Sequence, residues 1–333
     1  MALLRSLSTF RPDNFTLAIA ATVGFASLAP AGGGAADAVH VATILAIALL
    51  FFLHGARLSR EAVLSGALHW RLHLVVLAST FVLFPLLGLA FRQALASVLP
   101  DSLLAGLLFL CLLPSTVQSS IAFTSIARGN VAAAICSASL SNLVGIFLTP
   151  ALVASLMNVK GGVSLGAVVA IVLQLLAPFL AGHFLRPWVG AFVARHRAAV
   201  GFVDRGSILL VVYLAFSEAV VNGIWNVLGL GDLAKLLAVC ALLLAIVLAT
   251  TTFAARRLGF CRADEIVIVF CGSKKSLASG VPMAGVLFPL AQVGMAVLPL
   301  MLFHQIQLLA CAALARRYAS SAPAPAPEPR HAG

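Results

Sequence analysis

The feature that most constrains this chain is a series of ten long apolar stretches, which together occupy most of its 333 residues. A helix that spans a bilayer needs about 20 predominantly apolar residues, which matches these stretches. Hydrophobic residues make up 62% of the chain and charged residues 9%, whereas soluble proteins average about 45–50% and about 25%. A soluble protein so poor in charge could not cover its surface. The composition therefore excludes a soluble enzyme, a nucleic-acid-binding protein and a disordered scaffold.

The apolar stretches predict an all-α membrane protein with ten transmembrane helices. These spans are expected over residues 14–30, 39–56, 72–94, 102–127, 131–157, 163–185, 202–226, 233–255, 264–289 and 291–315. They define a ten-helix domain over residues 14–318, preceded by a cytoplasmic segment, 1–13. Residues 319–333 are rich in Pro and Ala without apolar periodicity, which predicts a disordered cytoplasmic tail.

The basic residues predict the orientation of the chain. With the N-terminus inside, 16 of the 21 Lys and Arg residues fall in inside segments, three fall in outside loops, and two lie within a span. An inside excess of this kind predicts that both termini are cytoplasmic and that the protein spans the cell (inner) membrane several times. A net charge of +11 indicates nucleic acid in a soluble protein. Here the charges sit in short loops, so the lipid bilayer is the expected partner and nucleic acid is not.

Spans four and nine hold polar patches within apolar sequence, over residues 114–130 and 271–282. Ten spans divide into five plus five, and an odd number per half gives the halves opposite orientation, as in the inverted repeats of secondary transporters. Spans four and nine are equivalent in such a repeat. Both patches contain helix-breaking Pro or Gly, and broken helices place half-helix ends at mid-membrane, where they can bind ions or substrate. The alternative is helix packing through small and hydroxyl residues.

Two adjacent lysines in span nine, Lys274 and Lys275, are the most costly residues in the chain. A lysine at the centre of a spanning helix costs about 2.5–3.5 kcal/mol on insertion scales. One lysine could face a cavity while the other bonds to backbone carbonyls of span four; the alternative is a re-entrant loop that carries both. Only Glu218, of the acidic residues, lies well inside a span. The expected site is thus net positive, which fits an anionic substrate or a lysine in place of a coupling cation.

The candidate substrate- and ion-binding residues are the polar residues of these patches and of span five: Gln118, Ser119, Ser120, Asn142, Ser273, Lys274, Lys275 and Ser276. The chain has no GxSxG, HExxH, P-loop or dinucleotide-binding motif. Its six cysteines lack metal-binding spacing. We therefore expect no enzymatic activity, no cofactor and no metal centre, with Na⁺ as the one candidate coupling ion.

Four segments together resemble the bile acid:sodium symporter family, also called solute carrier family ten. The resemblance lies closest to the branch of its seventh vertebrate member and bacterial relatives. The segments cover residues 52–59, 114–130, 142–150 and 270–282. The resemblance implies two inverted five-helix repeats with broken, crossing helices four and nine. It also implies a panel domain of helices 1, 2, 6 and 7, a core domain of helices 3–5 and 8–10, and alternating access as the core moves against the panel.

The chain departs from this family at the ion sites. Family members that couple to Na⁺ carry Glu-x-Gly-Met-Gln-Asn on span nine. With Gly272 aligned to the glycine, Phe270 takes the glutamate position, and Lys274 and Lys275 take the glutamine and asparagine positions. Positive charge thus replaces cation ligands, which favours Na⁺-independent transport.

The sequence predicts a secondary transporter that moves a small organic anion. A rival hypothesis is a non-transporting membrane regulator or scaffold, in which the lysines only brace the crossing helices. A sealed crossing with both lysines bonded to carbonyls would favour the rival, and a hydrated cavity that reaches the crossing would favour the transporter. A Na⁺-coupled symporter with a rearranged ion site is a further alternative.

Overall fold

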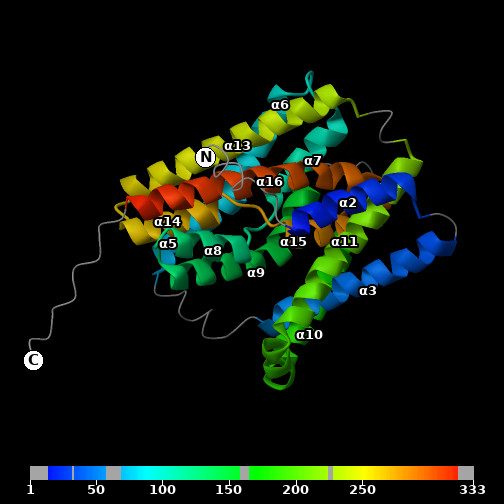
Figure 1. Cartoon of the computed structure of the whole chain (residues 1–333), viewed down its shortest axis with the longest axis horizontal. Helices are drawn as coiled ribbons and strands as arrows, with labels where there is room; N and C mark the ends of the chain where they lie inside the picture. Colours follow the sequence, from blue (N-terminus) through cyan, green and yellow to red (C-terminus); the bar gives the residue numbers. More distant parts are fainter. Residues whose placement is uncertain (1–13, 32–33, 58–68, 158–164, 224–227, 322–333) are drawn as a thin grey trace, which may run out of the picture.

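The structure is a computed structural model that describes residues 14–31, 34–57, 69–157, 165–223 and 228–321. All regular elements within these residues are helices, shown in Figure 1. They are α2 (Asn14–Leu28), α3 (Gly34–Arg57), α5 (Trp70–Ala78), the π-helical turn η3 (Ser79–Leu83), α6 (Phe84–Ala94), α7 (Asp101–Leu112), α8 (Gln118–Ile126), α9 (Val131–Leu156), α10 (Leu165–Arg195), α11 (Arg197–Val221), α13 (Leu230–Arg257), α14 (Arg262–Gly272), α15 (Leu277–Leu287) and α16 (Leu290–Ser320).

The described helices confirm an all-helical membrane protein. Seven helical stretches are long and apolar enough to cross a bilayer, and the shorter stretches Leu17–Leu28 and Asp101–Leu112 are also apolar. Large apolar side chains face outward, among them Trp188 and Phe202, which are 75% and 77% exposed. An apolar outer surface of this kind is compatible with contact to lipid, whereas in water it would favour aggregation.

Helix ends differ from the expected ones where hydropathy is a poor guide. α10 continues to Arg195, beyond the expected end at residue 185, because apolar content marks the lipid-facing part of a helix and not its last residue. α16 likewise continues to Ser320, beyond the expected end of the span at residue 315. The predicted N-terminal segment 1–13, and the tail from residue 322, lie outside the described residues.

Each of the two polar spans is split into two helices. Residues 113–117 separate α7 from α8, and residues 273–276 separate α14 from α15. Pro114 explains the first break, because proline lacks an N–H and forces the residue before it out of the helical region. Leu113 is accordingly extended, with φ −78° and ψ 156°. At the second break Ser276 is extended, and its side chain caps α15 by accepting the Ser279 N–H.

Two groups of helices pack together along a shared boundary (Figure 1). In the first group α11 contacts α2, α3 and α10, and α10 contacts α3. The remaining helices form the second group around α14 and α15. The boundary runs where α11 contacts α15 and α16, and where α10 contacts α9 and α15. In the most apolar part of the stretch Arg262–Leu287, 94% of the residues are buried. The broken span nine therefore lies at the centre of the protein.

A pair of glycines sets the close crossing of α3 and α10. A Cβ atom on Gly55 would lie 1.9 Å from the carbonyl oxygen of Phe179, and one on Gly182 would lie 1.9 Å from that of Phe52. Main chain therefore meets main chain at this crossing, which only glycine permits.

Candidate functional site

The two breaks lie against each other in the interior. The Ser276 N–H donates to the Pro114 carbonyl at 2.9 Å, and the Ser115 hydroxyl donates to the Cys271 carbonyl at 2.6 Å. These main-chain groups would find no water in a bilayer, so irregular backbone at this depth must be satisfied by the protein itself. We call residues 113–117 and 273–276, with the side chains that bond to them, the crossover.

Side chains satisfy the carbonyls that the end of α7 leaves free. The last carbonyls of a helix have no partner within it. Thr149 donates to Leu112 at 2.8 Å, and Asn142 donates to Ser115 at 2.8 Å. The carbonyls at the end of α14 are bonded in the same way by hydroxyls. Their pairs are Ser273 with Val269, Ser120 with Phe270, Ser115 with Cys271, and Ser79 with Gly272. Hydroxyl and amide side chains thus supply hydrogen-bond donors to the carbonyls that the two helix breaks leave unpaired.

Lys275 is fully buried, at 0% exposure, and its ammonium group lies among carbonyl oxygens. Its Nζ donates to the carbonyls of Thr80 at 2.8 Å, Cys111 at 2.9 Å and Leu113 at 2.6 Å. It also lies 4.1 Å from the centre of the Phe84 ring. All three ammonium protons therefore have an acceptor, and the ring face adds a cation–π contact.

Lys274 is also 0% exposed, but its surroundings differ. Its Nζ donates to one carbonyl, that of Ser119 in α8, at 2.9 Å. The ammonium group lies 4.1 Å from the ring centre of Phe123 and 5.3 Å from that of Phe270. Both lysines thus bond to carbonyls of span four, as expected for one of them, and neither faces solvent in this structure.

The remaining candidate residues divide by exposure. Gln118 is exposed at the first position of α8, a helix whose N-terminus has no side-chain cap. Ser119 is half-buried and its hydroxyl bonds to that of Thr116 at 2.8 Å. Asn142 is half-buried and accepts the Ser279 hydroxyl at 2.8 Å while it donates to Ser115. Ser120, Ser273 and Ser276 are buried, and their hydroxyls bond within the protein.

The crossover also contains residues outside the set of candidates named from the sequence. Gln307 is fully buried, accepts the Lys275 N–H at 2.9 Å and donates to the Lys275 carbonyl at 3.0 Å. Ser141 accepts the Ser115 N–H at 3.0 Å. The available signal for both was a polar residue inside an apolar span. Thr80 gave no such signal, because it contributes its backbone carbonyl.

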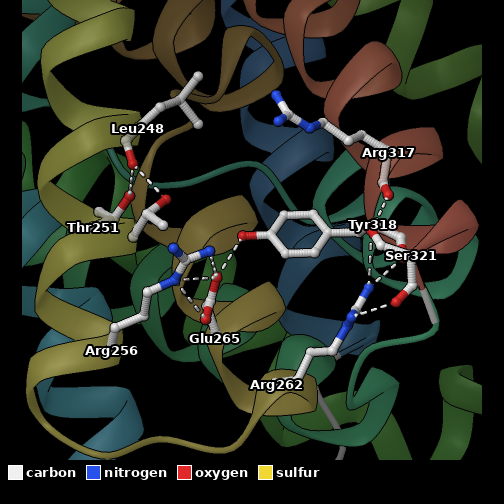
Figure 2. Close-up of polar contacts among 9 residues, drawn as sticks. Leu248, Thr251, Arg256, Arg262, Glu265, Arg317, Tyr318 and Ser321 are labelled. Carbon is white, nitrogen blue, oxygen red and sulfur yellow. Dashed lines mark hydrogen bonds and ion pairs between the residues drawn. The ribbon is translucent and has the colours of Figure 1, made fainter. Parts of the chain in front are cut away.

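A second polar cluster lies at the end of α14 remote from the break, and Figure 2 shows it. Arg256 forms a bidentate ion pair with Glu265, whose carboxylate oxygens lie 3.0–3.1 Å from the guanidinium nitrogens. The Tyr318 hydroxyl donates to Glu265 at 2.7 Å. Arg262 donates to the carbonyls of Tyr318 and Ser321. The cluster ties the ends of α13 and α16 to the start of α14.

In this structure lysine ammonium groups meet the carbonyl oxygens of the crossover. Ion sites within membranes commonly include a carboxylate. The ion pairs among the described residues are Arg57–Asp204, Lys235–Asp232 and Arg256–Glu265, and none involves Lys274 or Lys275. The three carbonyl oxygens that converge at Lys275 are already bonded to its ammonium group.

These observations define a multi-pass helical membrane protein whose interior holds two contacting broken helices and two buried lysines. The chain belongs to the SBF-like CPA transporter family, which it matches over residues 13–320. It is therefore a membrane transporter of the bile acid:sodium symporter type, as the resemblance implied. Both lysines bond to carbonyls, the arrangement expected of the non-transporting alternative, but membership of a transporter family does not favour that alternative.

Relatives that match more than nine-tenths of the chain include two with transporter names. A protein of Escherichia coli K12 with the provisional name symporter YfeH is 58% identical, over 92% of each chain. Sodium/bile acid cotransporter 7 of Rattus norvegicus is 27% identical, over 92% of each chain. An uncharacterised protein of Pseudomonas aeruginosa is 59% identical, over 93% of this chain and 94% of the relative.

Proposed function

We propose that the protein is a Na⁺-independent secondary transporter that moves a small organic anion across the inner membrane. The observation that carries the proposal is the uncompensated positive charge of the crossover. Lys274 and Lys275 are buried between the two broken spans, and the ion pairs of the described residues include neither. A negatively charged substrate is the ligand that such a site favours.

The N-terminus of α8 is the position where we place the substrate. Three features support it: an exposed Gln118, a half-buried Ser119, and the lack of a side-chain cap on the helix. Free N–H groups at the start of a helix bind anions, and the helix dipole adds to this attraction. Lys274 reinforces the positive potential, since its Nζ lies 2.9 Å from the Ser119 carbonyl oxygen.

Ten spans in two inverted repeats provide the proposed means of movement. In this arrangement α2, α3, α10 and α11 form the panel, and the other helices form the core. The contacts support this division, because within the panel α10 packs against α3, and α11 packs against α2 and α3. Contacts of α11 with α15 and α16, and of α10 with α9 and α15, join the panel to the core. The core would move against the panel along these contacts and expose the substrate to each side in turn, with both termini cytoplasmic.

Uptake into proteoliposomes tests the proposal. The purified protein is reconstituted and presented with labelled taurocholate, chosen because of the relatives' name, and with a panel of small carboxylates and sulfonates. Uptake is measured with inward gradients of NaCl, KCl or choline chloride. We expect saturable uptake of at least one anion, equal in the three salts. Uptake in NaCl alone would establish a Na⁺-coupled symporter. If none of these anions is taken up, and none raises the Tm of the purified protein, the non-transporting regulator would be favoured.

A matched pair of variants locates the substrate. Gln118→Ala should raise the half-saturation concentration about 10-fold or more, since a hydrogen bond to a charged group contributes about 1.5–3 kcal/mol. Gln292→Ala is the control, because Gln292 is an exposed glutamine in the first turn of another helix, α16. Equal effects of the two substitutions would contradict the placement at α8.

A further inference from the structure

The geometry around Lys275 resembles that of a bound ion more than that of an ordinary side chain. Three carbonyl oxygens from two separate spans converge on its Nζ at 2.6–2.9 Å. The group is completely buried, and no ion pair of the described residues neutralises it. Backbone carbonyl oxygens are also ligands that proteins use for hard metal cations.

The backbone forms this cluster of oxygens without help from the lysine. In the π-helical turn η3 the Phe84 N–H donates to the Ser79 carbonyl, five residues back. The next carbonyl, that of Thr80, would need the N–H of residue 85 in the same pattern. Residue 85 is Pro85, which has no N–H. The Thr80 carbonyl is therefore left without a partner in its own helix and points to Lys275.

The other two oxygens are freed by the break after α7. The helical partner of the Cys111 carbonyl would be the Ser115 N–H, which donates instead to the Ser141 hydroxyl at 3.0 Å. Leu113 is extended because Pro114 follows it, so its carbonyl leaves the helical ladder. Both oxygens lie at the C-terminal end of α7, where the helix dipole favours positive charge.

We infer that the carbonyl oxygens of Thr80, Cys111 and Leu113 form a monovalent-cation site that the protein fills with the ammonium group of its own Lys275. The lysine is a tethered cation, and an alkali-metal or ammonium ion is the ligand class that the site takes once the side chain is removed. This inference rests on the proposed function only for its consequence, that transport needs no free cation at this position.

Thermal denaturation of the purified full-length protein in detergent tests the inference without any transport assay. The apparent Tm of Lys275→Ala is measured in increasing NaCl, KCl, NH4Cl and methylammonium chloride, with choline chloride added to hold the ionic strength constant. An ion that binds only the folded protein raises the Tm with its concentration. We expect a rise of about 2–4 °C per tenfold increase above the dissociation constant for at least one small cation.

Three matched proteins separate a cation site from a general effect of salt. The wild-type protein should show no response, because its lysine occupies the site. Lys275→Met should show none, because its apolar side chain fills the space. Lys274→Ala should show none, because its Nζ meets one carbonyl and two aromatic rings and not three carbonyls.

The inference is overturned by any of three results. The first is a Lys275→Ala protein that folds and whose Tm does not depend on small cations. The second is a Lys275→Ala protein that cannot be recovered folded even when every step contains these cations. The third is a Lys275→Gln protein as stable as the wild type, since an amide donates hydrogen bonds without charge. Failure of uptake in proteoliposomes would leave the cation response unchanged, so the two proposals fail separately.

Discussion

Gln307 provides the sharpest test of how the crossover is held together. This fully buried side chain of α16 makes two hydrogen bonds to the main chain of Lys275, at 2.9 Å to the N–H and 3.0 Å to the carbonyl. Gln307→Met keeps the length and approximate volume of the side chain and removes both bonds, together with the 2.9 Å contact between Gln307 Nε2 and the ring of the half-buried His304. The N–H and the carbonyl of Lys275 then remain buried without a partner.

The magnitude follows from the number of orphaned groups. Each buried polar group left unsatisfied costs about 1–3 kcal/mol, so two cost about 2–6 kcal/mol. That loss corresponds to a fall in Tm of about 3–9 °C for a chain of this size. The exposed Gln292 of the same helix offers a control, Gln292→Met, which should change stability by less than about 0.5 kcal/mol.

Differential scanning fluorimetry in one detergent measures both variants. A Tm for Gln307→Met within about 2 °C of the wild type would refute the reasoning, because the orphaned groups would then have found other partners at no cost. An equal fall for Gln292→Met would show that the assay reports glutamine replacement in general and not the crossover.

Three further predictions concern the rest of the molecule. Gly182→Val should lower stability by about 3 kcal/mol or more, because a Cβ there would lie 1.9 Å from a carbonyl oxygen of α3. Its control, Gly201→Ala, should raise stability by up to about 1 kcal/mol, since no atom lies within 4 Å of a Cβ at that position. Glu265→Gln should lower stability by about 1 kcal/mol, less in high salt, because Arg256 is 65% exposed. Cys261 is the one exposed cysteine of six, so an impermeant maleimide should label it in inside-out vesicles and not in spheroplasts, and Cys261→Ser should abolish the labelling.

The sequence by itself determined the class of fold. Each of the ten apolar stretches coincides with one described helix or with two or three consecutive helical elements. The break in span four lies at Pro114, within the polar patch noted in the sequence. Proline alone does not mark a break, because Pro178 and Pro299 lie inside the continuous helices α10 and α16. Hydropathy depends on neighbouring residues alone, so the class of fold needed no tertiary information. The predicted ends of α10 and α16 were wrong, because both helices extend beyond their apolar regions.

The sequence also located the crossover, since two lysines within an apolar stretch are costly enough to be noticed. Only the tertiary structure decided what these lysines bind. Lys275 contacts the carbonyl of Thr80, which is 195 residues away in the chain. Every residue carries a backbone carbonyl, so the residue type does not indicate which carbonyl lacks a hydrogen-bond partner in its own helix. The partner was fixed by a π-helical turn, a proline and the packing of distant spans, and these become visible together only in the folded protein.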